Sequence, residues 1–140
     1  MNTTIALKNK FQPVRKSKLP VSLRTHKDEA KYLQAKQRGV ARRPLYEETP
    51  IQIWNNWMLI ENQFPYNAVF DTHHMLVPRR GGVIKADLSK TERQELEDIL
   101  DELSDIYDCY MVNYPKKQSI KSHYHIHLLT YKTDRRDLKL

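Results

Sequence analysis

The chain has 140 residues, of which 39% are hydrophobic, so its length and composition suit one domain with a single apolar core. Its one cysteine, Cys109, excludes an intramolecular disulfide and a zinc site made of several cysteines. No apolar run approaches the roughly 20 residues that span a bilayer, and the N-terminus lacks the apolar stretch of a secretory signal. We therefore expect a soluble, cytoplasmic protein that does not enter a membrane.

The positive charge is concentrated in the N-terminal third of the chain. Residues 1–50 contain 12 Lys and Arg against 4 Asp and Glu, whereas residues 51–140 contain 12 against 13. The first part is therefore the source of the formal net charge of +7. Such a basic arm attracts polyanions such as nucleic acid, but it also fits a solvated extension. Because no acidic residue precedes Asp28, an organelle-targeting presequence is a third interpretation.

A short helix is predicted within this basic arm. Thr25 has the side chain of an N-cap, and the helix is expected to run to about Arg38 and to stop at Gly39. Its apolar stripe is thin, because only Ala30 and Leu33 recur at helical spacing. The helix must therefore dock on another part of the chain to be stable.

A change in the hydrophobic pattern divides the chain into a basic N-terminal extension, residues 1–45, and a compact domain, residues 46–140. Ile51, Ile53 and the apolar run 57–60 are rich in β-forming residues, so they predict two short strands or one bent strand. Further along, the run from His73 to Val77 predicts a central strand, which Pro78 ends.

The clearest local signal is the start of an amphipathic helix at Ser89. Ser89 and Glu92 have the spacing of a capping box, in which each side chain bonds the backbone amide of the other residue. Apolar residues then recur at intervals of three and four, opposite a face rich in Asp and Glu. The apolar residues are Leu96, Ile99, Leu100, Leu103, Ile106 and Tyr107. This helix should cover one face of a sheet.

Five of the six histidines lie either in the pair at 73–74 or in the run 123–129. His123, His125 and His127 alternate with apolar residues, which is typical of a strand with two unlike faces. The three imidazoles should share one face, with neighbours roughly 6.5–7 Å apart, while the apolar residues enter a core. The apolar residues are Tyr124, Ile126 and Leu128.

The segment before this run also has β-character. It extends from Tyr110 to Tyr114 and is followed by a loop of about eight residues, Pro115 to Ser122. Together with the histidine run it predicts an antiparallel hairpin at the centre of the sheet.

Three kinds of chemistry fit a row of histidines. A neutral imidazole can attack phosphorus, because histidine is nucleophilic near its ordinary pKa of about 6.5. A His-x-His pair can also supply two ligands to a metal ion, with His73, His74 or an acidic residue completing the set. In the third interpretation, the imidazoles are half-exposed surface residues without a role.

The run from His123 to Leu129 resembles the His-φ-His-φ-His-φ-φ motif of the histidine-triad (HIT) nucleotide hydrolases and transferases, where φ is apolar. Residues 72–80 resemble the strand of this family that begins with a histidine and ends in proline and basic residues, and that register selects His73 as a fourth active-site histidine. The whole resemblance covers roughly residues 46–131.

Three further segments resemble parts of the family that contact the nucleotide. Asn62 begins an Asn-x-Phe-Pro sequence similar to that of the diadenosine-tetraphosphate phosphorylase and galactose-1-phosphate uridylyltransferase branches. Asn113 ends an apolar strand ten residues before the triad, and Gln118-Ser119 resembles a phosphate-binding pair. Where the family has glycine before that pair this chain has Lys117, and Ser119 or Ser122 is a substitute for Gln118.

The resemblance implies an α+β, HIT-like fold, in which one long amphipathic helix covers an antiparallel sheet of about five strands. It implies attack by His125 on the α-phosphorus of a nucleoside phosphoanhydride or phosphoramidate, through a covalent nucleotidyl-histidine. His123 and His127 would orient His125 and donate to the phosphate or leaving group, and His73 would support them. This mechanism needs no metal or other cofactor.

The same resemblance implies a nucleotide as substrate and a homodimer as a candidate assembly. Two other functions remain open. One is a metal-dependent hydrolase that uses the same histidines. The other is a nucleic-acid-binding protein, in which the HIT-like fold is a module and the basic arm binds the polyanion.

Overall fold

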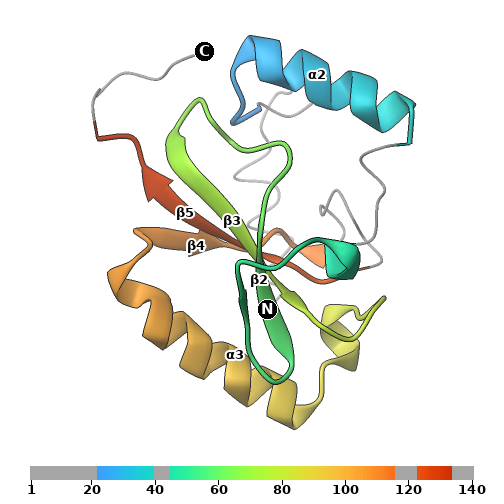
Figure 1. Cartoon of the computed structure of the whole chain (residues 1–140), viewed down its shortest axis with the longest axis vertical. Helices are drawn as coiled ribbons and strands as arrows, with labels where there is room; N and C mark the ends of the chain where they lie inside the picture. Colours follow the sequence, from blue (N-terminus) through green and yellow to red (C-terminus); the bar gives the residue numbers. More distant parts are fainter. Residues whose placement is uncertain (1–21, 40–44, 116–122, 134–140) are drawn as a thin grey trace, which may run out of the picture.

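The computed structural model describes residues 22–39, 45–115 and 123–133, which form an α+β fold. Its centre is a five-stranded antiparallel sheet with the strand order β1-β2-β3-β5-β4. The strands are β1 (Gln52–Ile53), β2 (Trp57–Glu61), β3 (Phe70–Pro78), β4 (Cys109–Met111) and β5 (Ile126–Tyr131). The helices are α2 (His26–Gln37) and α3 (Lys90–Glu102), with 3-10 turns η2 (Leu45–Glu47), η3 (Lys85–Asp87) and η4 (Leu103–Asp105). The sheet lies between the two α-helices (Figure 1).

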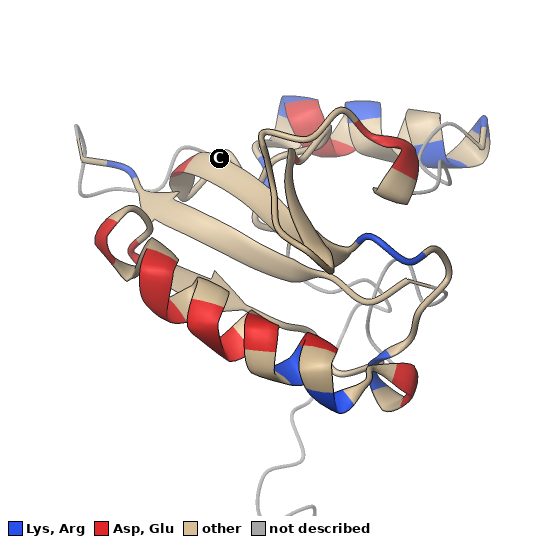
Figure 2. Ribbon diagram, turned by 60° about the horizontal axis from the view of Figure 1, so that its bottom comes forward, with Lys and Arg blue, Asp and Glu red and all other residues tan. Residues whose placement is uncertain are grey.

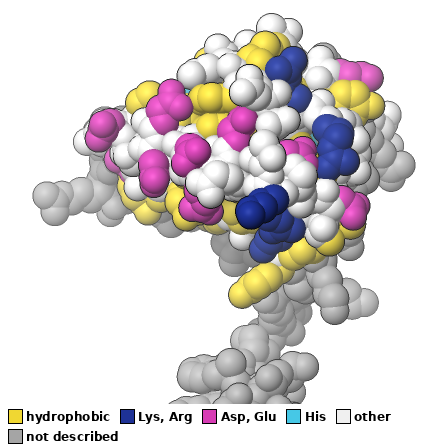
Figure 3. All heavy atoms as spheres, turned by 90° about the horizontal axis from the view of Figure 1, so that it is seen from below, with side chains coloured by type: hydrophobic (Ala, Val, Ile, Leu, Met, Phe, Trp, Pro, Cys, Tyr) yellow, Lys and Arg dark blue, Asp and Glu magenta, His cyan; other side chains and the backbone are white. Residues whose placement is uncertain are grey.

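The predicted capping box is confirmed at the start of α3. The Glu92 amide donates to Ser89 Oγ at 3.1 Å, and the Ser89 amide donates to Glu92 Oε1 at 2.8 Å. The outer side of α3 is strongly acidic (Figure 2), and Asp and Glu side chains gather on the same face in the space-filling view (Figure 3). The predicted apolar stripe is correct except at Ile106, which is 63% exposed. Ile106 lies beyond the end of α3 and directly after η4, so it no longer follows the helical spacing.

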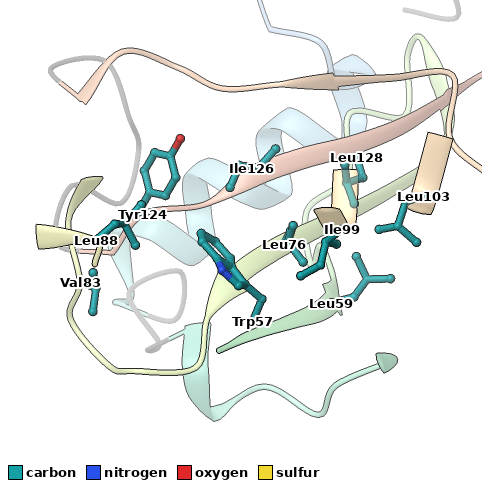
Figure 4. Close-up of a cluster of buried hydrophobic side chains, with 10 residues drawn as sticks. All are labelled: Trp57, Leu59, Leu76, Val83, Leu88, Ile99, Leu103, Tyr124, Ile126 and Leu128. Carbon is teal, nitrogen blue, oxygen red and sulfur yellow. The ribbon is translucent and has the colours of Figure 1, made fainter. Parts of the chain in front are cut away.

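The face of the sheet under α3 is an apolar core, which we call the α3 face (Figure 4). Ile99 and Leu103 of the helical segment pack against side chains of β2, β3 and β5. Those strand residues are Trp57, Leu59, Leu76, Ile126 and Leu128. At roughly 25 cal/mol per Å² of apolar surface, burial of each such side chain stabilises the fold by about 1.5–3 kcal/mol. Tyr124 joins the same cluster, so the predicted inward direction of the apolar residues in the histidine run is confirmed.

The predicted hairpin is antiparallel, but its position and length were wrong. β4 covers only Cys109–Met111 and forms the edge of the sheet, whereas β5 lies between β3 and β4. β5 is buried on both faces over its first four residues, which suits an interior strand. Tyr110 is 59% exposed, and Val112, beyond the end of β4, is 38% exposed; these residues suit an edge better than a centre.

The predicted helix in the basic arm is α2, with Thr25 as its N-cap and Gly39 at a φ of 79° just beyond its C-cap Arg38. Its apolar stripe was wrong, because Ala30 and Leu33 are exposed. Polar and aromatic side chains of the helix dock instead, because the loop between β2 and β3 offers amide and aromatic partners. No helix in the described part of the chain is long and apolar enough to cross a membrane.

Contacts cross the predicted boundary at residue 45. The Ala68 amide donates to the Leu23 carbonyl at 3.0 Å, so the segment before α2 is tied to the loop between β2 and β3. Asn67 accepts from the Thr25 amide and donates to the Asp28 carboxylate. Leu45 is buried with apolar residues of β2 and β3. The described part of the extension is thus packed onto the domain.

Candidate active site

The histidines lie on the side of the sheet opposite α3, which we call the histidine face. His127 is in β5, beside Met75 of β3, while His123 and His125 immediately precede the strand. The three triad histidines are only 2–4% exposed. The interpretation as half-exposed surface residues is therefore wrong, because tyrosine rings and neighbouring segments cover this face.

His73 of β3 joins the row through a hydrogen bond, as its ring Nε2 lies 2.7 Å from His127 Nδ1. The Tyr66 amide donates to His73 Nδ1 at 3.0 Å, so a neutral His73 carries its proton on Nε2. That proton is then donated to His127 Nδ1. Consequently a neutral His127 carries its own proton on Nε2, a buried atom that has no hydrogen-bond partner in the part of the chain that the structure describes.

His123 has the same tautomer for a separate reason. The Gly82 amide donates to His123 Nδ1 at 3.1 Å, and this places the proton of a neutral His123 on Nε2. That Nε2 is also buried, and no described residue forms a hydrogen bond with it. Gly82 has a φ of 70°, a conformation that glycine adopts without the steric cost of a side chain. A left-handed turn thus directs a backbone donor at this ring.

His125 has the opposite tautomer. Its Nδ1 lies 3.0 Å from the His123 carbonyl oxygen, which can only accept, so Nδ1 carries the proton and Nε2 keeps a lone pair. The rings of His125 and His127 meet edge to face with centroids 5.0 Å apart. The middle histidine therefore offers a lone pair, while the histidine on each side offers an N–H.

Burial keeps the cluster uncharged at neutral pH. It lowers the pKa of His73 to about 3 and that of His127 to about 2, and the Arg24 guanidinium contributes to both shifts. Burial also lowers the pKa of His123, with the neighbouring His125 adding to the effect and the backbone of Pro78 opposing it. The pKa of His125 is lowered by burial and raised by its bond to the His123 carbonyl. The lone pair of His125 is thus available at pH 7.

Two of the residues that were predicted to contact the nucleotide, Asn62 and Asn113, lie beside this histidine cluster. Asn62 Nδ2 is 3.2 Å from His73 Nε2 and 3.5 Å from Met75 Sδ. Because both nitrogens carry hydrogen in the tautomers above, we assign the amide hydrogen to the sulfur. Asn113 hydrogen-bonds the side chain of Tyr66. Gln118, Ser119 and Ser122 lie outside the described residues.

The paired histidines at 73–74 are separated by the sheet. Successive residues of a strand point to opposite faces, so His74 leaves the row that His73 joins. Its Nδ1 lies 2.6 Å from the Tyr107 hydroxyl. The structure therefore brings His73, and not His74, together with His127, as the family register implied.

Two residues of this site were not predicted from the sequence. The Tyr66 ring lies over His73 and His127, with centroids 4.3 and 5.3 Å apart, and its amide fixes the tautomer of His73. The Arg24 guanidinium lies over the Tyr66 and Tyr32 rings at 5.0 and 4.0 Å. Tyr66 directly follows the Asn-x-Phe-Pro segment, which is a signal for it, but no local pattern indicates Arg24.

The basic pair that follows Pro78 is engaged with other parts of the protein. Arg79 donates to the Trp54 and Asn55 carbonyls at 3.0 and 3.2 Å. Arg80 forms an ion pair with Glu92 at 2.9 Å, which ties this turn to the start of α3. Within the described residues, no group of three or more His, Cys, Asp and Glu side chains is arranged to hold a metal ion.

Comparison with known proteins does not assign this chain to a family. No protein-family model matches the chain, and no curated protein matches it. Among solved structures, it is similar to the crystal structure of HTC1, with a TM-score of 0.45 and 20% sequence identity over 79% of this chain and 76% of that one. The strand pairing itself defines an α+β protein with a five-stranded antiparallel sheet, and its chemistry has to be argued from the histidines.

Proposed function

We propose that this protein is a nucleotide hydrolase or nucleotidyltransferase, which acts at the α-phosphate of a nucleoside phosphoanhydride or phosphoramidate through His125. One observation carries the proposal: the buried Nε2 atoms of His123 and His127 have no hydrogen-bond partner among the described residues. These two histidines lie on either side of His125, whose Nε2 has a lone pair. A buried unsatisfied donor costs about 1–3 kcal/mol. A phosphate group bound at His125 would accept from both donors.

The reaction consists of two displacements at phosphorus. In the first, His125 Nε2 forms a bond to the α-phosphorus, and the bond from phosphorus to the leaving oxygen or nitrogen breaks. The electron pair goes to the leaving group, which takes a proton from solvent. In the second, water or another acceptor attacks phosphorus, loses its proton and releases His125. The N–H groups of His123 and His127 stabilise the phosphoryl oxygens in both steps.

Preorganisation supports this assignment of roles. Backbone groups set the tautomers, because the amides of Tyr66 and Gly82 and the carbonyl of His123 are fixed by the fold. Donors that are already oriented need no rearrangement as charge develops on phosphorus. The resemblance of the run 123–129 to the HIT motif supports the same roles, and a HIT-like identity for the sheet and α3 is part of this proposal.

The proposal includes a nucleotide as substrate, a cytoplasmic location and a homodimer as candidate assembly. Nucleic acid is proposed as a further partner for the basic arm, of which residues 1–21 lie outside the described part of the chain. The two rival functions differ from this proposal in one respect, since neither requires a nucleotidyl group on His125.

A direct test is to look for the covalent intermediate. The protein is incubated with adenosine and guanosine phosphoramidates and with dinucleoside polyphosphates, then quenched without acid, and its intact mass is recorded. A nucleotidyl adduct is expected in the wild type and in His74→Ala, whose imidazole lies on the other face, but not in His125→Ala. Unchanged turnover in His125→Ala would remove the mechanism.

The tautomers supply a check that needs no substrate. In nitrogen-15 spectra of the neutral protein, His125 should carry its proton on Nδ1, whereas His73, His123 and His127 should carry it on Nε2. If His125 is protonated on Nε2 instead, it has no lone pair directed away from the backbone, and it cannot be the nucleophile.

A further inference from the structure

Tyr46, in the 3-10 turn η2, lies at the opposite end of the histidine row from Tyr66. Its ring is tilted by 31° against the ring of His123, with centroids 5.7 Å apart. His123 is 4% exposed, whereas Tyr46 is 42% exposed. One part of the tyrosine ring therefore covers the first triad histidine, and the remainder faces outward beside it.

Gly81 leaves the space that this ring occupies. A Cβ atom at Gly81 would lie 2.8 Å from Tyr46 Cε1 and 2.9 Å from Cζ, closer than carbon atoms normally approach. In contrast to Gly82, Gly81 does not have a positive φ, so its backbone conformation does not require glycine. Any larger residue would displace Tyr46 from His123.

The two tyrosines beside the histidine row differ in what covers them. Tyr66 is overlaid by the Arg24 guanidinium and hydrogen-bonded by Asn113. Among the described residues, the one ring that stacks on Tyr46 is His123. Tyr46 thus offers an aromatic surface next to a buried, unpartnered N–H, the Nε2–H of His123.

We propose that Tyr46 belongs to the substrate-binding site, where its ring stacks on a nucleobase of the bound nucleotide, and that Gly81 admits this ring. The inference rests on the function proposed above, because a nucleotide held at His125 places a planar base within reach of the surrounding walls. Aromatic side chains are common stacking surfaces for bases, since every base has a π-face. Tyr46 would select for a planar group without selecting among bases.

The test uses four variants of the whole chain: Tyr46→Ala, Tyr46→Phe, Gly81→Ala, and the double variant that combines Tyr46→Ala with Gly81→Ala. Binding of adenosine monophosphate is measured by calorimetry, and KM and kcat are measured with adenosine phosphoramidate and with diadenosine polyphosphate. Tyr131→Ala is the control, because Tyr131 is also half-exposed, at 51%, and stacks on one ring, that of Phe70.

Loss of one stacked base is expected to weaken binding by about tenfold in Tyr46→Ala, with Tyr46→Phe close to the wild type. Gly81→Ala should cause a similar loss in the presence of Tyr46 and no further loss in Tyr46→Ala, because the clash needs the ring. A loss with adenosine monophosphate assigns the stacked base to the transferred nucleotide. A loss confined to the diadenosine substrate assigns it to the leaving group.

Two results would overturn the inference while leaving the proposed function standing. One is wild-type affinity and KM in Tyr46→Ala, as expected for Tyr131→Ala. The other is an effect of Gly81→Ala that persists at full size in Tyr46→Ala. If the wild type neither binds adenosine monophosphate nor forms a nucleotidyl adduct with any substrate, then the proposed function itself has failed.

Discussion

On the α3 face, β2, β3 and β5 meet the helix across a cluster of mainly apolar side chains, whereas the histidine face buries four imidazoles. The first arrangement needs shape and volume alone, because apolar burial is not directional. The histidine face needs a hydrogen-bond partner for each buried ring nitrogen, because a buried polar atom without a hydrogen bond destabilises the fold. Two of these nitrogens, Nε2 of His123 and Nε2 of His127, have no such partner among the described residues.

The faces also differ in how far along the chain their partners come from. The α3 face is completed mainly by one element, the helix α3, which lies between β3 and β4 in the chain. The histidine face draws on Arg24, Tyr46, Tyr66 and Gly82, from four separate segments. Apolar packing on the α3 face tolerates small shifts of the side chains. The hydrogen bonds of the histidine face instead require that several segments distant in sequence are all correctly positioned.

The largest expected effect on stability is on the α3 face. Ile99 is 1% exposed, so Ile99→Ala should lower the free energy of unfolding by about 2–5 kcal/mol through lost burial and a cavity. Ile106→Ala is the control, because its side chain is 63% exposed and should cost less than about 0.5 kcal/mol. Urea unfolding measures both, and equal costs would contradict the assignment of this core.

Acid should destabilise the histidine face specifically. The pKa of His73 is lowered to about 3 and that of His127 to about 2 in the folded chain. In the unfolded chain both histidines have the ordinary pKa of about 6.5. Below pH 6.5 the unfolded chain therefore binds protons at these histidines, whereas the folded chain does not. The stabilisation is present above pH 6.5 and is lost as the pH falls. The slope should be about 1.4 kcal/mol per pH unit for each of these histidines.

Unfolding titrations at pH 7, 6 and 5 measure that slope. The double variant His73→Gln with His127→Gln should make the slope shallower, since two of the four buried histidines are gone, whatever its absolute stability. A slope that is the same in the double variant would mean that other groups cause the acid sensitivity.

A smaller effect is expected at the link between α2 and the histidine face. Arg24 Nε donates to the Phe64 carbonyl at 2.8 Å, and its guanidinium lies over Tyr66. Arg24→Met should lower the free energy of unfolding by about 1–2 kcal/mol and slow adduct formation, because Tyr66 is held less firmly over His73.

Lys31→Met is the matched control for Arg24. It removes the same charge from the same segment, but its side chain is 62% exposed and its ion pair with Asp28 spans 3.7 Å. It should leave adduct formation unchanged. Equal rates of adduct formation in the two variants would show that Arg24 has no part in the site.

The smallest predicted change is at the start of α3. Ser89→Ala removes one half of the capping box and should cost about 1 kcal/mol without altering adduct formation, because the histidines lie on the other face. Ser104, whose Oγ donates to the Asp101 carbonyl in an exposed turn, supplies the control Ser104→Ala with a smaller cost. A matching loss of histidine chemistry in Ser89→Ala would show that the two faces are coupled.

The local features of this protein were determined by short stretches of sequence. The capping box at Ser89 and the Thr25 cap of α2 depend on neighbours within three residues, so they were predictable. The alternation from His123 to Leu128 likewise predicted which side chains share a face, because that follows from the period of a strand. The choice of His73 over His74 came from the resemblance to a family.

The order of the strands and the completion of the site were decided by tertiary structure. The edge position of β4 depends on which strand best fills the interior, a comparison across the whole sheet. Arg24 and Tyr46 reach the histidines through packing contacts between segments far apart in the chain, and no local period records such contacts. The sequence supplied a row of histidines, and the fold set the tautomer of each ring, because the backbone groups that bond them come together only in three dimensions.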